Sequence, residues 1–491
     1  MSDELTKNFN DQQRARYEKL ARARARGSEP YPLRATRTHR AQDAIDAFTR
    51  DGKLENAQLA GRLVAFRDMG KITFAHLQDG SGKIQLFFRQ NVFGAENYAM
   101  LLKEYDLGDF IGVTGNLFRT KTGEITVEVL RLELYAKTLS PLPEKWHGLK
   151  DTETRYRQRY LDLLSNETAR NLFLARAQIV RAMRKYLDER GFLEVETPTL
   201  QPLYGGAAAE PFSTHHNKLD RDLYLRIATE LYLKRLLVGG YERVYEIGKN
   251  FRNEGIDATH NPEFTMLECY QAYADYTAMM TLVEEMFGAC AHAARGALQL
   301  SYQGNAIDLT PPWRRVTMRD AILDATKIDI YDSTDLKSLR ARIEQLGLKV
   351  EHQPTWGKTV DEIVKNFVEP KLIQPTFLID YPEELSPFAK KKPEQEGMVE
   401  RFEAFIGGFE CGNAFTELND PIDQYQRFVD QARQRAAGDK EAHQVDLDFI
   451  EALMHGMPPT GGLGVGVDRL VMILTDQASI REVMLFPQLR T

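Results

Sequence analysis

Residues 58–137 carry the feature that most constrains the fold, five short runs in which apolar and polar residues alternate between turn residues. Such alternation predicts short β-strands. The runs are QLAGRLVAFRD, KITFAHLQDGSG, KIQLFFR, GDFIGVTGNLF and EITVEVLRLELYA, and a helix-like segment, ENYAMLLKEY, follows the third. Five strands with one helix at this place fit the OB-fold, a small Greek-key barrel whose open face binds oligonucleotides, and an SH3-like barrel is the alternative.

The rest of the chain requires at least one further domain, because 491 residues exceed what a single hydrophobic core holds. Apolar residues make up 43% and charged residues 27%, which is the balance of a folded protein. The formal net charge of −7 does not by itself indicate a nucleic-acid partner. No run approaches the roughly 20 apolar residues of a membrane-spanning helix, and residues 1–20 lack the apolar core of a secretory signal. We therefore expect a cytoplasmic protein without membrane contact.

The cysteines give no sign of covalent or metal cross-links. Cys269, Cys290 and Cys411 lie far apart and show no CxxC spacing. We therefore expect reduced thiols, and neither a disulfide framework nor a structural zinc site.

The sequence divides into four parts. A basic helical extension covers residues 1–57, the barrel covers 58–140, a proline-bearing linker covers 141–168, and a larger domain covers 169–491. In the larger domain a helical pattern stops at Gly191, and the run FLEVETPTL after it predicts a strand. Residues 273–374 mix helical patterns with a TPPWRR segment and are interpreted as a helical insertion between strands of the site.

A run of six basic residues lies in the extension between Asp11 and the break at Gly27 and Pro30. They are Arg14, Arg16, Lys19, Arg22, Arg24 and Arg26. A basic helix of this kind can follow the phosphates of a nucleic acid. The alternative is a solvated helix face whose charge is balanced by Asp11 and Glu18.

Residues 243–270 predict a long hairpin with chemistry on one face. Side chains alternate along a strand, so Phe264, Met266, Glu268 and Tyr270 share a face in the second arm. The first arm and loop offer an anion-binding arginine and polar groups suited to ATP. These residues are Arg252, Glu254, His260 and Asn261. The alternative is an exposed hairpin with surface ion pairs.

The run RFEAFIGGFECGNAFTELND places carboxylates in what reads as a strand. Glu403 and Glu410 are seven residues apart, so we expect a bulge at Gly407–Gly408 to bring them to a common side. Two such carboxylates together with nucleotide phosphates suit Mg²⁺. Asn413, Phe415 and Glu417 share one face by alternation, although a strand kept soluble by its charges also fits.

The last motif, PPTGGLGVGVDRLVMIL, places four glycines before an apolar run. Glycines let backbone approach a ligand closely. The spacing is wrong for a dinucleotide fingerprint, and no βαβ unit follows. Arg469, near the expected helix start, would place a cation beside a phosphate.

Taken together, three segments resemble the motifs of class II aminoacyl-tRNA synthetases. GFLEVETPTL, with Pro198, resembles motif 1, FRNEG followed by HNPEFTMLE resembles motif 2, and GLGVGVDRL resembles motif 3. GGAAAEPFSTHHN, TELYLKRLLVGG and NAFTELNDPIDQ are similar to the bacterial, lysine-specific branch, and the resemblance covers nearly the whole chain. It implies an α+β catalytic domain with a mainly antiparallel sheet flanked by helices, after an OB-fold barrel, in a homodimer built on motif 1.

The resemblance also implies roles for particular residues. Arg252 and Arg469 would be catalytic, through the α-phosphate and the terminal phosphate of ATP, and Glu403 and Glu410 would hold Mg²⁺. The remaining ATP contacts would be Glu254, His260, Asn261 and Phe264, with Glu403. Lysine would be bound by Gly206, Glu230, Glu268, Tyr270, Asn413, Phe415 and Glu417. The anticodon of the lysine tRNA would contact Arg67, Phe74, Gln85 and Glu124 in the barrel.

The resulting hypothesis is a lysine–tRNA ligase that forms lysyl-adenylate from ATP and lysine and transfers the lysyl group to the 3′ end of tRNA. The alternatives are a related synthetase for aspartate or asparagine, an enzyme that lysylates a protein, and a non-catalytic RNA-binding relative. Three residues depart from the family pattern, namely Glu210, Thr229 and Phe409. They put the loop around Gly205–Pro211 and its nucleotide or lysine contacts in question.

Overall fold

The computed structural model describes residues 2–143, 149, 151–436 and 442–489. The chain divides into two compact units, Met1–Gly148 and Leu149–Thr491. The proposed linker, 141–168, lies partly outside the described residues. Its described part contains two helices, α6 (Thr152–Arg157) and α7 (Arg159–Ser165).

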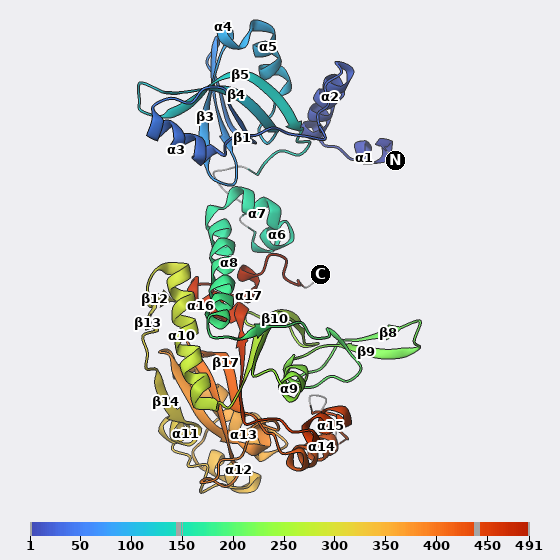
Figure 1. Cartoon of the computed structure of the whole chain (residues 1–491), viewed down its shortest axis with the longest axis vertical. Coiled ribbons are helices and arrows are strands. Elements are labelled where there is room, and N and C mark those ends of the chain that lie inside the picture. The colour runs from blue at the N-terminus through green and yellow to red at the C-terminus, as the bar shows by residue number, and fades with distance from the viewer. Residues whose placement is uncertain (1, 144–148, 150, 437–441, 490–491) are drawn as a thin grey trace. The chain divides into compact units, whose positions relative to one another are not determined.

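The first unit is a closed barrel with the strand order β1-β2-β3-β5-β4 (Figure 1). Its strands are β1 (Ala57–Asp68), β2 (Ile72–Gln78), β3 (Lys83–Arg89), β4 (Phe110–Arg119) and β5 (Ile125–Ala136). Two helices, α4 (Gln90–Phe93) and α5 (Ala95–Glu104), lie between β3 and β4. Alternate residues of the strands point inward to a core that includes Leu59, Leu77, Leu86 and Val127. The OB-fold prediction is confirmed.

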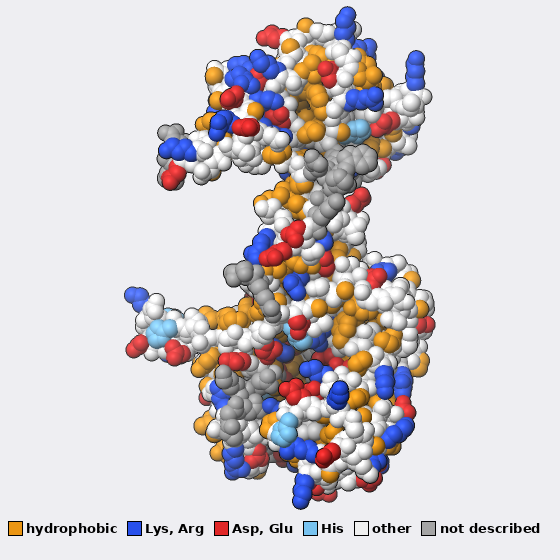
Figure 2. Space-filling model, turned by 180° about the vertical axis from the view of Figure 1, so that it is seen from behind, with side chains coloured by type: hydrophobic (Ala, Val, Ile, Leu, Met, Phe, Trp, Pro, Cys, Tyr) orange, Lys and Arg blue, Asp and Glu red, His pale blue; other side chains and the backbone are white. Residues whose placement is uncertain are grey.

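The extension forms α1 (Ser2–Lys7), α2 (Asp11–Ala25) and α3 (Ala41–Asp51). Figure 2 shows Lys and Arg side chains gathered over α2. Arg22 and Arg26 form ion pairs with Glu104 of the barrel, at 3.2 and 3.3 Å, and Lys19 pairs with Asp106 at 2.7 Å. Arg16 donates to the carbonyl of Thr138, just after β5, at 3.3 Å. Four of the six basic residues of this run therefore attach it to the rest of the first unit.

The second unit is built on an eight-stranded sheet with the order β14-β15-β16-β17-β18-β11-β10-β6. Only the outermost pairs, β14 with β15 and β10 with β6, are parallel. The strands are β6 (Leu193–Glu194), β10 (Arg243–Phe251), β11 (Glu263–Ala272), β14 (Arg314–Thr317), β15 (Thr376–Pro382), β16 (Met398–Ile406), β17 (Phe409–Thr416) and β18 (Thr460–Gly466). This is the mainly antiparallel sheet that the resemblance implied.

One face of the sheet packs on long helices and the other carries polar side chains. The core of the first face joins the sheet to α8 (Glu167–Asp188), α10 (Tyr276–Arg295) and α16 (Val467–Leu474). Leu267 and Cys269 of β11 belong to this core, so Glu268 and Tyr270 point to the opposite face. There α9 (Glu230–Val238), α14 (Pro421–Ala436) and α15 (Leu447–Met454) form a smaller core.

The remaining elements lie at the edges of this layer. Two short sheets are β7 (Leu200–Gln201) with β9 (Arg221–Leu225) and β8 (Ser213–His216), and β12 (Gln299–Tyr302) with β13 (Asn305–Asp308). The helices are α11 (Met318–Thr326), α12 (Leu336–Gln345), α13 (Trp356–Ile363) and α17 (Ile480–Val483), with the single turns η1 (Val364–Val368), η2 (Glu369–Lys371) and η3 (Glu383–Leu385).

Three expectations differ from the structure. The run FLEVETPTL is two short strands, β6 and β7, instead of one, and Pro198 between them has no N–H for a ladder. Gly407 and Gly408 form the turn of the β16–β17 hairpin, with φ of +66° and +88°. The bulge lies before this turn, between Ala404 and Phe405. Within 273–374, α10 and β14 belong to the main core and sheet, while α11, α12 and α13 share a core of their own.

A buried arginine attaches α7 to the C-terminal segment. Arg159 is fully buried, donates to Asp162 at 2.7 Å, and donates to the carbonyls of Leu485, Arg481 and Met484 at 3.1 Å each. Breaking a buried charge pair leaves the other partner uncompensated.

Replacing Arg159 with Leu should lower the free energy of unfolding of this unit by about 3 kcal/mol, because the Asp162 carboxylate and three carbonyls lose a donor. Urea denaturation followed by circular dichroism measures this. The control is Arg433→Leu, which removes an exposed ion pair with Asp430 in the same unit and should change the midpoint little. Equal midpoints for the two variants would contradict the prediction.

Candidate functional site

Three buried carboxylates meet on the polar face of the sheet. Glu230 begins α9, Glu268 lies in β11, and Glu417 follows β17. Their exposed fractions are 4%, 4% and 1%. The resemblance placed these three among seven lysine ligands, and the structure brings them together. Burial raises the pKa of Glu417, and the charges of Glu230 and Glu268 add to that effect.

A fourth charged group, Lys234, lies inside this cluster. Its ammonium is 2.5 Å from Glu230 Oε1 and 2.5 Å from Glu417 Oε2, and its side chain is 0% exposed. The ammonium also lies 5.0 Å from the centre of the Phe388 ring. Sequence reasoning missed Lys234, although its spacing of four residues from Glu230 in a helix is a signal for an ion pair.

Glu268 is held by neutral donors. The backbone N–H of Thr229 donates to Glu268 Oε1 at 3.0 Å, and the amide of Asn250 donates to the same oxygen at 3.2 Å. The Tyr270 hydroxyl lies 3.4 Å from the other oxygen. These contacts fix the carboxylate in one position without a positive partner.

Two glycines make room for the carboxylates. A Cβ at Gly462 would meet Glu417 Oε1 at 1.9 Å, and a Cβ at Gly206 would meet the Glu230 Cβ at 2.9 Å. Gly206 also has a φ of +86°, which side chains rarely adopt. Gly206 therefore borders the cluster, as expected, while the glycine of β18 admits the Glu417 side chain.

Burial changes the protonation of this cluster. Burial raises the pKa of Glu417 to about 8; the charge of Lys234 lowers it and the charge of Glu230 raises it. Burial likewise raises the pKa of Glu230, against the opposing charge of Lys234. The cluster therefore binds a proton more readily than free carboxylates do, and a cation in the site would displace it.

The positive side of the site begins where β10 ends. Arg252 lies over the Phe264 ring at 5.1 Å, and its buried Nε has no hydrogen-bond partner among the described residues. Burial lowers the pKa of Arg252, and Glu254, Glu410, Arg469 and Glu268 are the charges that act on it. The guanidinium thus lies between the acidic cluster and a second arginine, with a donor free for an anion.

Arg469, in the first turn of α16, is part of a small network. Its guanidinium donates to the carbonyl and the carboxylate of Glu410, at 2.9 and 3.2 Å, and lies 3.2 Å from His260 Nε2. His260 Nδ1 lies 2.8 Å from Asp257. Two of the predicted ATP residues, Arg469 and His260, are therefore in contact.

The other predicted nucleotide residues take different positions. Asn261 is buried, donates to the Glu263 carbonyl at 2.6 Å and accepts from the Gln488 N–H at 3.3 Å, so its amide shapes the loop. Glu254 is exposed. Burial lowers the pKa of Arg252, and the charge of Glu254 opposes that effect.

The carboxylates of Glu403 and Glu410 come from facing strands, β16 and β17. Burial, followed by the charge of Glu410, raises the pKa of Glu403 to about 8. Glu403 accepts from Arg401 at 2.5 Å and from the Tyr381 hydroxyl at 2.8 Å. Among the described residues, no three His, Cys, Asp or Glu side chains come together as a ready-made metal site.

Arg401 lies beside this pair, and sequence reasoning did not identify it. It donates to Asn413 Oδ1 at 3.2 Å and lies 5.4 Å from the centre of the Phe415 ring. Asn413 and Phe415 pair with Gly464 and Gly462 of β18. The predicted common face of Asn413, Phe415 and Glu417 is present.

The three departures from the family pattern have local explanations. The carbonyl of Glu210 accepts from Asn253 N–H at 2.7 Å, a contact that the side chain does not affect. Thr229 acts through its backbone N–H on Glu268. Phe409 packs against Tyr302 with ring centres 5.8 Å apart.

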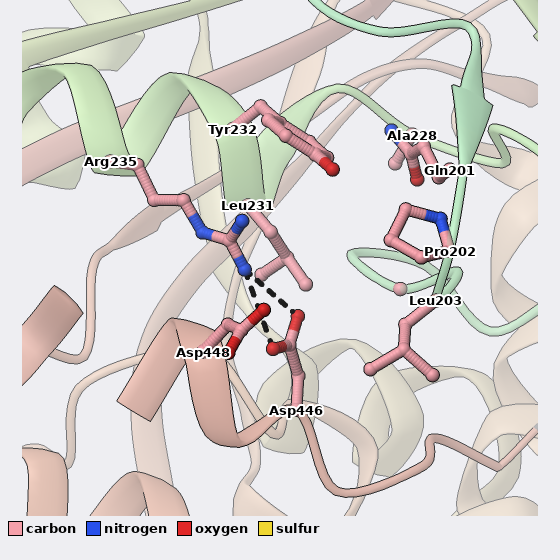
Figure 3. Close-up of a pocket in the computed structure, with 10 residues that line it drawn as sticks. Gln201, Pro202, Leu203, Ala228, Leu231, Tyr232, Arg235, Asp446 and Asp448 are labelled. Atoms are coloured by element: carbon pink, nitrogen blue, oxygen red, sulfur yellow. Dashed lines mark hydrogen bonds and ion pairs between the residues drawn. The ribbon is translucent and has the colours of Figure 1, made fainter. Parts of the chain in front are cut away.

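A small cavity of about 40 Å³ lies beside α9 (Figure 3). Its lining includes Gln201, Leu231 and Arg235, and Arg235 donates to Asp446 at 3.1 Å. None of the predicted site residues lines it. The cavity is therefore separate from the acidic cluster.

The barrel has a polar and aromatic outer face formed by β2, β3 and the β4–β5 connection. Gln85 donates to Glu124 at 2.8 Å, and Phe74 lies 4.9 Å from Phe87, its cross-strand partner. Arg67 pairs with Phe74 across the β1–β2 ladder. All four predicted anticodon residues thus share one face. Sequence reasoning missed two neighbours on it, Phe87 and His76.

The fold and the site define a class II synthetase. The family model for class II tRNA synthetases specific for D, K and N matches residues 151–490, and the model for the OB-fold nucleic acid binding domain matches 57–135. The chain belongs to this family of class II tRNA synthetases.

Curated relatives are more specific. Proteins named lysine–tRNA ligase from Chloroflexus aurantiacus and Roseiflexus castenholzii are 57% and 56% identical, over 98% of this chain and 99% of each relative. One from Pelotomaculum thermopropionicum is 54% identical over 98% of this chain and 95% of that protein. The chain is a member of the lysine–tRNA ligase family. None of its described helices has the length and apolar character needed to cross a bilayer.

Proposed function

We propose that this chain activates lysine with ATP and transfers it to tRNA. The observation that carries the proposal is the group of three buried carboxylates, because a long cationic amino acid needs acidic partners when it leaves water. An aspartate or asparagine substrate would not suit this group. The nearly full-length relatives named lysine–tRNA ligase support the same substrate.

Within the site we assign the lysine ligands by charge and place. Glu417 binds the ε-ammonium, and Glu230 and Gly206 bind the α-amino end. Glu268, Tyr270 and Asn413 lie along the side chain, and Phe415 forms an apolar wall. The support is the burial of the carboxylates and the close approach of Gly206 to Glu230.

Arg252 and Arg469 bind the phosphates of ATP. An oxygen of the lysine carboxylate attacks the α-phosphorus, the bond to the β-phosphate oxygen breaks, and pyrophosphate leaves. A carboxylate is already a nucleophile at neutral pH, so the step needs alignment and charge neutralisation. A ribose hydroxyl at the 3′ end of tRNA then attacks the carbonyl carbon of the adenylate, and AMP leaves. The Arg252 Nε, which has no hydrogen-bond partner in the described part of the chain, suits an oxygen of the α-phosphate. Glu254, His260, Asn261 and Phe264 surround the nucleotide.

Glu403 and Glu410 would hold Mg²⁺. Their oxygen atoms are the ligands this ion prefers, with phosphate oxygens and water completing the shell. The two carboxylates act on one another, because burial and then the charge of Glu410 raise the pKa of Glu403 to about 8, and a cation between them would oppose that effect. Bound there, Mg²⁺ would neutralise charge on the phosphates.

The barrel reads the anticodon through Arg67, Phe74, Gln85 and Glu124, and the basic residues of α2 that remain exposed, Arg14 and Arg24, contact phosphates.

We also propose a homodimer through α8 and β6. Its support is the exposure of Leu174 and Leu193, at 58% and 45%. We also propose that the enzyme acts in the cytoplasm, together with its tRNA substrate. The domain limits 1–57, 58–140, 141–168 and 169–491 remain our proposal.

Lysine should support ATP–pyrophosphate exchange by the purified chain, and Arg252→Ala should lower the exchange rate by about 10²–10³-fold, because the α-phosphate loses its fixed donor. The control, Arg433→Ala, removes an exposed arginine that pairs with Asp430 and should leave the rate unchanged. Strong exchange with aspartate and none with lysine would refute the assigned substrate.

Lysine should bind more tightly as pH rises from 6 to 8. Burial raises the pKa of Glu417 to about 8, and a cationic ligand favours the ionised form, so the site must lose a proton to bind it. Below pH 8 the Kd for lysine should rise by up to about tenfold per pH unit. Calorimetric titration with lysine between pH 6 and 8.5 measures this, and a flat profile would contradict it.

Replacing Phe74 with Ala should lower kcat/KM for tRNA by about tenfold, because stacking on an aromatic ring stabilises an unpaired base by about 1–3 kcal/mol. Lysine-dependent pyrophosphate exchange should stay unchanged. The matched control is Leu33→Ala, which truncates a fully exposed side chain of the same unit. An equal decrease in kcat/KM for tRNA in the control would contradict the proposed role of the aromatic face.

A further inference from the structure

The position of Lys234 raises a question that the assigned ligands do not answer. A protein that binds lysine through acidic side chains has placed one of its own lysines between two of them. An internal ammonium in such a site competes with the ligand unless the site was built with one negative charge too many. The three carboxylates and Lys234 therefore have to be counted together.

The net charge of these four groups matches the two ammonium groups of lysine. Glu230, Glu268 and Glu417 carry three negative charges when ionised, and Lys234 carries one positive charge. Two negative charges remain, and lysine brings two ammonium groups, one at the α-carbon and one at the end of its side chain. The ligand carboxylate is directed to the nucleotide and the arginines beside it.

The geometry explains how Lys234 can balance one negative charge and stay in place when lysine binds. It belongs to α9, one turn after Glu230, and its side chain is covered by Phe388. It contacts Glu230 through Oε1 and Glu417 through Oε2, while Glu417 Oε1 has no hydrogen-bond partner in the described part of the chain. Glu417 thus keeps Oε1 for a ligand, and Lys234 contacts Glu230 through one of its two oxygens.

We propose that Lys234 is a positioning residue for lysine recognition, whose ammonium clamps the Glu230 and Glu417 carboxylates and balances one of the three negative charges. This inference rests on the proposed lysine site. The charged and titratable groups that face the bridged pair are Glu268 and Tyr270 from β11 and Arg401 from β16. Arg401 acts on Glu230 only at a distance, because its own hydrogen bonds go to Glu403, Asn413, Ser386 and a backbone carbonyl.

Lys234→Met keeps much of the length and volume of the side chain and removes the charge. Without the ammonium, three neighbouring carboxylates repel one another, and a proton takes the place of the lost charge at neutral pH. The Kd for lysine should therefore rise by about tenfold or more at pH 7. The difference in Kd between variant and wild type should shrink as pH rises to 9. The pH dependence of lysine binding is therefore shifted to higher pH in the variant. KM for ATP should change by less than about twofold, because the phosphates are bound elsewhere.

The chain offers a matched control in the barrel. Lys137 has a side chain that is 1% exposed and bridges Asp106 and Asp109 at 2.5 and 2.8 Å, so it has the same arrangement without a ligand site. Lys137→Met should lower stability and leave the lysine Kd and its pH profile as in the wild type. A Lys234→Met variant with wild-type lysine affinity and pH profile would overturn the proposal, while lysine-dependent exchange by the wild type keeps the proposed function.

A second measurement covers the case in which Lys234→Met does not fold. In a crystal structure of the wild-type protein with lysine, the Lys234 ammonium should stay within about 3.2 Å of both carboxylates. The ligand's ammonium groups should contact their free oxygens. A complex in which Lys234 has left either carboxylate would overturn the proposal. A complex with lysine bound far from Glu417 would instead refute the proposed site.

Discussion

The structure of the second unit depends on the burial of three carboxylates away from solvent. Removing one ionised carboxylate from water costs several kcal/mol unless compensating charges and donors replace the water. The chain meets this cost in different ways: Glu268 receives neutral donors from Thr229 and Asn250, whereas Glu230 and Glu417 share one ammonium. The surrounding architecture follows from this need. The sheet holds Glu268 rigidly, α9 brings Glu230 and Lys234 on successive turns, and β18 is stripped of side chains where Glu417 must fit.

The same sheet separates two opposite electrostatic environments by only a few residues. Along β11, Glu268 faces the acidic cluster, and Phe264, four residues earlier, lies under the Arg252 guanidinium. A substrate with a cationic tail and a carboxylate head can therefore lie along one strand face with each end in a suitable field. Arg401 donates hydrogen bonds to Asn413 of β17 and Glu403 of β16. The acidic cluster and the arginine thus follow one another along the same strand.

Much of this arrangement could be predicted from sequence because strands obey a simple period. The alternation in residues 264–270 and 413–417 determined which side chains share a face, and five short runs predicted a barrel. The errors arose where one local signal serves several structures. A glycine pair fits both a bulge and a tight hairpin turn, and only the register across β16 and β17 decides between them. Lys234 was missed because a lysine on a helix is ordinarily solvated. Its burial follows from Phe388 and Glu417, more than 150 residues away, and no local pattern contains that information.

The absence of a side chain at position 462 has a consequence for how the substrate range of such a protein can change. Any L-amino acid there would bring a carbon atom to within 1.9 Å of Glu417 Oε1, so the smallest possible step already displaces an acidic group. Substitutions at this position therefore cannot change the shape of the pocket in small steps. A descendant that selects another amino acid would have to alter the acids themselves first, and only afterwards could larger residues enter the strand beneath them.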